Sequence, residues 1–190
     1  MTHRSGFVAL VGRPNTGKST LTNALVGSKV AITSDRPQTT RNVIRGIVQL
    51  PAAQIILVDT PGLHRPRNLL GERLNALVAQ NWADVDVVVM CFPADEPIGA
   101  GDRFIAAELA ALPRIPKVAV VTKCDATDKQ HTGERLLAVQ ELGAELGINW
   151  THIVPVSAVA GDQVELLTTL LLDLLPEGPA LYPAGTATDE

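Results

Sequence analysis

A glycine-rich segment at residues 12–19, which reads GRPNTGKS, leaves few folds open to this chain. The segment matches the pattern G-x-x-x-x-G-K-S/T and directly follows the apolar run 7–11, which is typical of a buried strand. A strand, a glycine loop and a helix that begins near Gly17 make a concave anion site, because backbone N–H groups and the helix N-terminus point into the same space. The pattern therefore predicts a nucleoside triphosphate site.

Phosphate and metal ligands are expected from this loop and from a second segment, DTPG at 59–62. Lys18 would reach the β- and γ-phosphates, and the Ser19 hydroxyl would bind Mg²⁺. Asp59, at the end of an apolar run, would hold Mg²⁺ through water, and the Gly62 N–H would meet the γ-phosphate. Pro-Gly after a strand is by itself an ordinary turn signal, and its pairing with the loop favours the nucleotide role. The other loop positions expected to bind nucleotide are Asn15, Thr16, Gly17 and Thr20.

Composition indicates an α/β domain of ordinary size. The chain has 190 residues, 46% hydrophobic but only 3% aromatic, as expected for Val-, Ile- and Leu-rich strands under Ala- and Leu-rich helices. Its net charge of −4 excludes the basic surface of a nucleic-acid domain, so an RNA contact must be local or lie outside this chain. The longest apolar run, 85–92, is too short for a membrane span. Cys91 and Cys124 lack metal or redox spacing, which favours a reduced, cytoplasmic setting.

Strand-like runs alternate with helical patterns along the chain. We expect strands at 7–11, 43–50, 54–58, 85–92, 117–121 and 153–156. We expect helices at 18–26, 69–80, 102–111, 133–146 and 163–175. This alternation predicts an α/β fold with a mostly parallel, doubly wound sheet and one antiparallel strand from a hairpin at 51–53. From residue 176 the sequence turns to Pro, Gly, Ala, Thr and acidic residues, so we expect a domain over 1–175 and a linker over 176–190.

Two later segments fit a guanine base. TKCD at 122–125 follows one strand, and Asp125 would accept hydrogen bonds from the N1–H and 2-amino groups of guanine. Adenine offers neither donor, so a carboxylate left unpaired would reject it. The Lys123 stem would cover the base and ribose, and a backbone N–H in SAV at 157–159 would contact guanine O6. Each segment alone is common, and their order and spacing carry the prediction. The expected base-binding residues are Thr122, Lys123, Asp125, Ser157, Ala158 and Val159.

In this order the motifs resemble those of the translation-factor class of small GTPases and, within it, the Era family. The matching segments read GRPNTGKSTL at 12–21, SDRPQTTR at 34–41 and DTPGLHRP at 59–66. The PQTTR sequence and the GLH after DTP separate the pattern from the Der and MnmE families. The resemblance covers residues 6–178. It implies a three-layer P-loop NTPase fold of the Ras-like G-domain type, with a mostly parallel six-stranded sheet and one antiparallel strand.

The resemblance also implies a function. Era-family proteins are GTP-binding and GTP-hydrolysing switches with GTP, GDP and Mg²⁺ as ligands, and they serve 30S subunit assembly and 16S rRNA maturation. They bind that RNA and the 30S subunit through a C-terminal KH domain, whose GxxG loop and basic helix do not follow residue 175 here. We expect a monomer in the cytoplasm. Peripheral association with the inner face of the cell membrane is a further expectation.

Turnover is expected to depend on a few residues near the γ-phosphate. Switch I would span 29–42, with the Thr40 hydroxyl closing on Mg²⁺. Leu63 follows Gly62 and cannot orient water, so slow turnover is expected without further assistance. Asn15 would help bind K⁺, as in MnmE-type relatives; the alternative is that it only stabilises the loop. The expected catalytic residues are Asn15, Lys18, Thr40 and Gly62.

Several alternatives stay open at this point. Thr122 stands where Era proteins commonly have Asn, which affects the contact with the phosphate loop. Arg36, Arg41 and Arg45 make one segment locally basic, and we favour solvated loop charge over an RNA contact. The competing functions are a Der- or MnmE-type GTPase domain, a phosphate-loop kinase or ATPase, and a nucleotide-binding module with little turnover.

Overall fold

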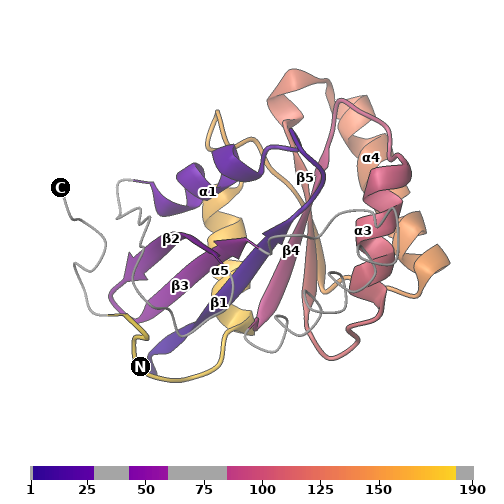
Figure 1. Cartoon of the computed structure of the whole chain (residues 1–190). Helices are drawn as coiled ribbons and strands as arrows, with labels where there is room; N and C mark the ends of the chain where they lie inside the picture. The colour runs from indigo at the N-terminus through magenta and orange to yellow at the C-terminus, as the bar shows by residue number, and fades with distance from the viewer. Residues whose placement is uncertain (1, 28–42, 60–84, 183–190) are drawn as a thin grey trace.

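The computed structural model describes residues 2–27, 43–59 and 85–182 (Figure 1). Its strands are β1 (Arg4–Val11), β2 (Val43–Leu50), β3 (Ala53–Asp59), β4 (Val87–Pro93), β5 (Lys117–Thr122) and β6 (His152–Pro155). Its helices are α1 (Lys18–Val26), α3 (Ala100–Ala110), α4 (Lys129–Leu146) and α5 (Val164–Leu174), with a 3-10 turn at Cys124–Ala126.

These strands form one six-stranded sheet in the order β2-β3-β1-β4-β5-β6. β2 pairs antiparallel with β3 through the short hairpin, and the other neighbouring strands pair in parallel. The predicted sheet, mostly parallel with one antiparallel strand, is confirmed. Among the described helices, none is both long enough and apolar enough to cross a lipid bilayer.

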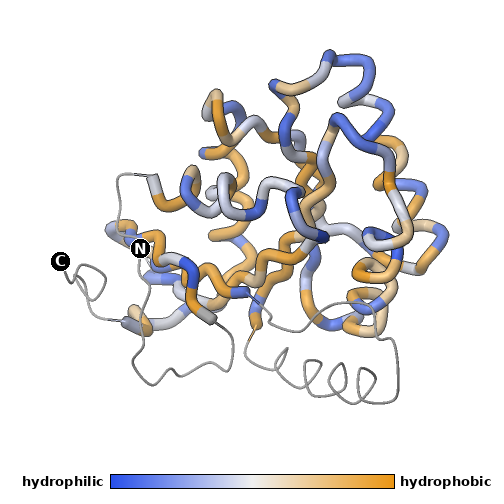
Figure 2. The backbone as a smooth tube through the Cα atoms, turned by 45° about the horizontal axis from the view of Figure 1, so that its top comes forward, coloured by the Kyte–Doolittle hydropathy of each residue, from blue (hydrophilic) through white to orange (hydrophobic). Residues whose placement is uncertain are grey.

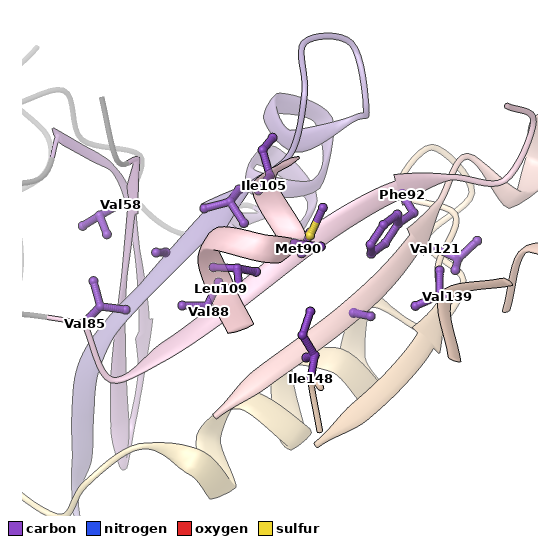
Figure 3. Close-up of a cluster of buried hydrophobic side chains, with 14 of the residues drawn as sticks. Val58, Val85, Val88, Met90, Phe92, Ile105, Leu109, Val121, Val139 and Ile148 are labelled. Atoms are coloured by element: carbon purple, nitrogen blue, oxygen red, sulfur yellow. The ribbon is translucent and has the colours of Figure 1, made fainter. Parts of the chain in front are cut away.

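Helices cover both faces of the sheet and give the fold three layers (Figure 1). Because side chains alternate along a strand, Leu10 of β1 packs with Leu21 of α1 and Leu167 of α5, whereas Ala9 lies in the cluster on the other face. That second cluster includes α3 and α4 residues and is drawn in Figure 3. Figure 2 shows the hydrophobic residues concentrated along the strands. The central strand β4 is apolar throughout because both of its faces are buried.

The helix predicted at 133–146 begins one turn earlier, at Lys129. Asp128 is the cause: its Oδ1 accepts the His131 N–H at 2.8 Å and caps the first turn. The helix predicted at 69–80 and the whole predicted switch I segment, 29–42, lie outside the described residues.

Residues 176–182 contact the amino ends of β1 and β3, the edge opposite the glycine loop. The fully buried side chain of Gln54 accepts the N–H groups of Leu181 and Tyr182 at 2.8 and 3.0 Å and donates to the Tyr182 carbonyl at 2.8 Å. The Gly178 N–H donates to the His3 carbonyl at 2.9 Å. The first part of the segment with linker composition is therefore hydrogen-bonded to the sheet.

Candidate nucleotide-binding site

The loops that carry the sequence motifs meet at one edge of the sheet, beyond the carboxyl ends of the parallel strands. The glycine loop follows β1, the 122–125 segment ends β5, and the 157–159 segment follows β6. Asp59 is the last residue of β3 and reaches the same edge. Ligands of open α/β sheets bind at this edge, because the loops there converge on the helix N-termini.

Glycines at two positions shape the loop. Gly12 has φ +151°, and a Cβ there would lie 2.8 Å from Thr16 Oγ1 and 3.1 Å from the Cys91 carbonyl oxygen. Gly17 has φ +92° and passes the chain into α1. The buried Thr16 hydroxyl donates to the Arg13 carbonyl at 2.9 Å and closes the loop on itself. The backbone is thus fixed without filling the concave side.

Lys18 begins α1 and lies over this loop. Its Nζ donates to the Gly12 carbonyl at 2.6 Å, and within the described residues it makes no ion pair. Leu21 is fully buried and anchors the first turn of the helix. An ammonium group held by a neutral carbonyl can exchange it for a phosphate oxygen, which forms a stronger, charge-assisted hydrogen bond.

The loop is also attached to α3 through Arg13. Its Nε donates to Asp102 Oδ2 at 3.0 Å, and its Nη2 lies 3.3 Å from Glu96 Oε1. Asp102 is 1% exposed and also accepts the Gly99 N–H, which caps α3. Sequence reasoning missed this contact, because Arg13 occupies a variable position of the motif.

Three contacts organise the base end of the site. The Lys123 Nζ donates to the Asn15 carbonyl at 2.7 Å, so its stem crosses the glycine loop. The Ser157 hydroxyl donates to Asp125 Oδ1 at 2.8 Å and accepts the Ala160 N–H at 3.2 Å. Asp125 is exposed. Ser157 thus holds the Asp125 carboxylate in place as a hydrogen-bond acceptor, at the same edge of the sheet as Lys18.

Thr122 connects β5 to the glycine loop although it is shorter than asparagine. Its hydroxyl donates to the Thr16 carbonyl at 2.5 Å and is buried. The threonine thus binds the loop backbone directly from the end of β5.

The Thr122→Val variant should weaken GDP binding about threefold to tenfold, since it removes one buried hydrogen bond worth about 1 kcal/mol. Titration with a fluorescent GDP measures the change. Thr168→Val is the matched control, because the Thr168 hydroxyl donates to a carbonyl within α5, away from the site. Equal losses in the two variants would contradict a role specific to Thr122.

The metal side of the site is a cavity of about 340 Å³ beside the start of α1. Its lining residues are Leu10, Lys18, Ser19, Thr22, Asn23, Arg45 and Asp59. The Ser19 hydroxyl and the Asp59 carboxylate offer the hard oxygen ligands that Mg²⁺ prefers, so these residues fit the expected metal. Arg45 Nε and Nη2 lie 2.8 and 2.7 Å from Asp59 Oδ2, a pair that sequence reasoning did not anticipate.

Most of the predicted site residues lie together at this edge. One stretch of surface is surrounded by the loop residues, Thr122, Lys123, Asp125 and the 157–159 segment. Val159, the last residue of that segment, is 78% exposed at the rim. Thr40 and Gly62, and with them the predicted switch contacts, lie outside the described residues.

Cys91 of β4 lies directly behind the glycine loop. It is fully buried, and burial raises the pKa of its thiol to about 12 despite the opposing influence of Lys18. Cys124, next to the base-binding segment, is half-buried, and desolvation raises the pKa of its thiol also. The site is therefore flanked by two neutral thiols.

The sheet order, the glycine loop after β1 and the Asp125–Ser157 pair together define a phosphate-loop domain of the GTPase class. A family model described as 50S ribosome-binding GTPase matches residues 7–123. The chain belongs to this family, and it is similar throughout its length to GTPases named Era.

Individual relatives support this assignment. The chain is 65% identical over 188 residues to GTPase Era of Streptomyces coelicolor and 64% identical over 187 residues to that of a Nocardioides species. The matches cover 99% and 98% of this chain but 59% and 60% of those proteins, so the chain spans about three fifths of its relatives' length.

Solved structures of Era resemble this fold. One, in complex with MgGDPNP and a fragment of 16S ribosomal RNA, is 34% identical with a TM-score of 0.76 and covers 99% of this chain and 62% of that one. Another, a variant of Aquifex aeolicus Era bound to GDP and AlF4⁻, is 34% identical with a TM-score of 0.74 and covers 98% and 62% of the two chains.

Proposed function

We propose that the chain binds GTP and GDP with Mg²⁺ and hydrolyses GTP, so that it acts as a molecular switch. The observation that supports guanine most directly is the hydrogen bond from Ser157 Oγ to Asp125 Oδ1, which orients the carboxylate. The remaining lone pairs of Asp125 suit the N1–H and 2-amino groups of guanine, which adenine lacks. At the other end of the site, Lys18 and the loop N–H groups suit a chain of phosphates.

The described residues act on the nucleotide by binding and orienting it. Lys18 Nζ would exchange the Gly12 carbonyl for β- and γ-phosphate oxygens. Ser19 and Asp59 would hold Mg²⁺, which neutralises charge that develops on the phosphates. The residue after Gly62 is Leu63, and a leucine side chain cannot polarise water. The proposal therefore includes slow intrinsic GTP hydrolysis.

Comparison of fluorescent GDP and ADP in equilibrium titrations, followed by single-turnover hydrolysis of GTP, tests the proposal. We expect GDP to bind at least about 100-fold more tightly than ADP, because ADP would leave the Asp125 carboxylate unpaired at a cost of about 3 kcal/mol. Equal affinities would support a kinase- or ATPase-like domain instead. Tight GDP binding without any GTP hydrolysis would support a nucleotide-binding module.

Hydrolysis should run several-fold faster in K⁺ than in Na⁺ at equal ionic strength. Asn15 is exposed on the loop, and its side chain has no hydrogen bond with any described residue, which favours a ligand role over loop stabilisation. A K⁺ bound there would neutralise charge on the β–γ bridging oxygen. Single-turnover rates in the two salts measure the effect.

Asn15→Ala should lose this cation preference while it still binds GTP. Asn149→Ala is the control, because Asn149 is exposed after α4 and away from the loop. Equal rates in Na⁺ and K⁺ for the wild type would assign Asn15 to loop stability.

We further propose that this switch serves small-subunit ribosome assembly. The structure of a similar Era protein with 16S ribosomal RNA supports this. The chain itself has a net charge of −4, so we place the main RNA surface outside it. A salt-resistant, submicromolar affinity of this chain for 16S rRNA would contradict that placement. Pull-down of 30S precursors by this chain and by the full-length Era of Streptomyces coelicolor, with GTP and with GDP, would test the partner.

A further inference from the structure

A β-bulge in β2 lies at Arg45, which lines the metal side of the site. Ile44 pairs with Val58 and Gly46 pairs with Leu57, so Arg45 is an extra residue without a partner in β3. Bulges bend the strand and redirect one side chain, and they are frequent beside active sites.

The guanidinium binds one oxygen of Asp59. Nε and Nη2 of Arg45 both approach Oδ2, at 2.8 and 2.7 Å, and both side chains are partly exposed, 51% and 32%. The two residues line one cavity with Lys18 and Ser19. Asp59, whose carboxylate is expected to bind the metal, is thus also the ion-pair partner of Arg45.

We propose that Arg45 and Mg²⁺ compete for the Asp59 carboxylate, so that Arg45 sets the Mg²⁺ affinity of the nucleotide site. The inference rests on the proposed nucleotide function. A guanidinium bound to a carboxylate weakens the attraction of that carboxylate for a second cation. Solvent screens a pair this exposed, so the effect is moderate. Arg45 therefore adjusts metal affinity without adding or removing a ligand.

The experiment measures release of fluorescent GDP from the full chain as a function of Mg²⁺ concentration, and the readout is the concentration that half-maximally slows release. Arg45→Met keeps the length of the stem and removes the charge. We expect the midpoint to fall about twofold to fivefold, the scale of an exposed ion pair. An unchanged or higher midpoint would overturn the competition.

Two further variants test whether the effect runs through Asp59. Arg103→Met is the matched control, because Arg103 is also 51% exposed and pairs with Glu145 at 2.8 Å across α3 and α4. Its midpoint should equal the wild type. In an Asp59→Asn background, Arg45→Met should no longer lower the midpoint; a persistent shift would overturn the assignment to this pair.

The proposal stays testable if Arg45→Met folds poorly, because Arg45→Gln also removes the charge and should lower the midpoint in the same direction. Thermal melting identifies a folding defect in either variant. Failure of the wild type to bind fluorescent GDP would refute the nucleotide function. Normal wild-type binding with no effect of Arg45 would refute this inference alone.

Discussion

The Lys18→Ala variant should bind GTP about 10- to 150-fold more weakly than the wild type, the equivalent of about 1.5–3 kcal/mol for a charge-assisted contact. Its hydrolysis should be nearly abolished. Within the described residues, the Lys18 ammonium is held over the glycine loop by the Gly12 carbonyl, and we expect phosphate oxygens as its partners in the bound state. Titration with fluorescent GTP and single-turnover hydrolysis measure the two effects.

The fold should tolerate this change, because Lys18 packs on the loop and not in either hydrophobic cluster. Lys129→Ala is the control for general loss of positive charge, since Lys129 is exposed at the start of α4. If Lys18→Ala hydrolysed GTP at the wild-type rate, the glycine loop would have no role in hydrolysis. Equal weakening by Lys129→Ala would indicate long-range charge instead of contact.

The Asp125→Asn variant should shift preference from guanine to xanthine at least about tenfold, or about 1.4 kcal/mol. The amide oxygen can keep the hydrogen bond from Ser157, which turns the amide NH₂ toward the base. A donor there repels the 2-amino group of guanine and suits the 2-oxo group of xanthine. Competition of XTP and GTP against fluorescent GDP measures the shift.

Asp128→Asn is the matched control for this variant. Asp128 lies three residues further on, is exposed, and caps α4 with an oxygen that asparagine also provides. The control should keep the wild-type preference. Unchanged GTP affinity in Asp125→Asn would remove Asp125 from the base site.

Local patterns in the sequence were sufficient for the fold and for much of the site. The glycine loop, the strand before it and the hairpin of β2 and β3 are each encoded by neighbouring residues, and parallel strands necessarily bring their carboxyl ends to one edge. The loop, Asp125 and Ser157 could therefore be placed together from spacing alone. The early start of α4 was missed because its cap, Asp128, lies within a polar run that has no helical periodicity.

Contacts that depend on tertiary geometry were not predictable. Arg45 pairs with Asp59 beside a bulge in the pairing of two strands, and a sequence pattern reports neither the pair nor the bulge. Arg13 reaches Asp102 across 89 positions of the chain. Likewise, the segment after residue 175 has the composition of a linker. Its contact with the sheet could not be predicted, because the side chain that binds it, Gln54, is an isolated buried polar residue in β3.

The two protonated thiols beside the site make this chain well suited to chemical labelling. Only thiolates react quickly with alkylating reagents, and both Cys91 and Cys124, the only cysteines of the sequence, have raised pKa values. A cysteine introduced at the exposed Val159 would therefore react first, without removal of either native residue. A fluorophore attached there would sit at the rim of the base-binding segment and report nucleotide exchange in real time.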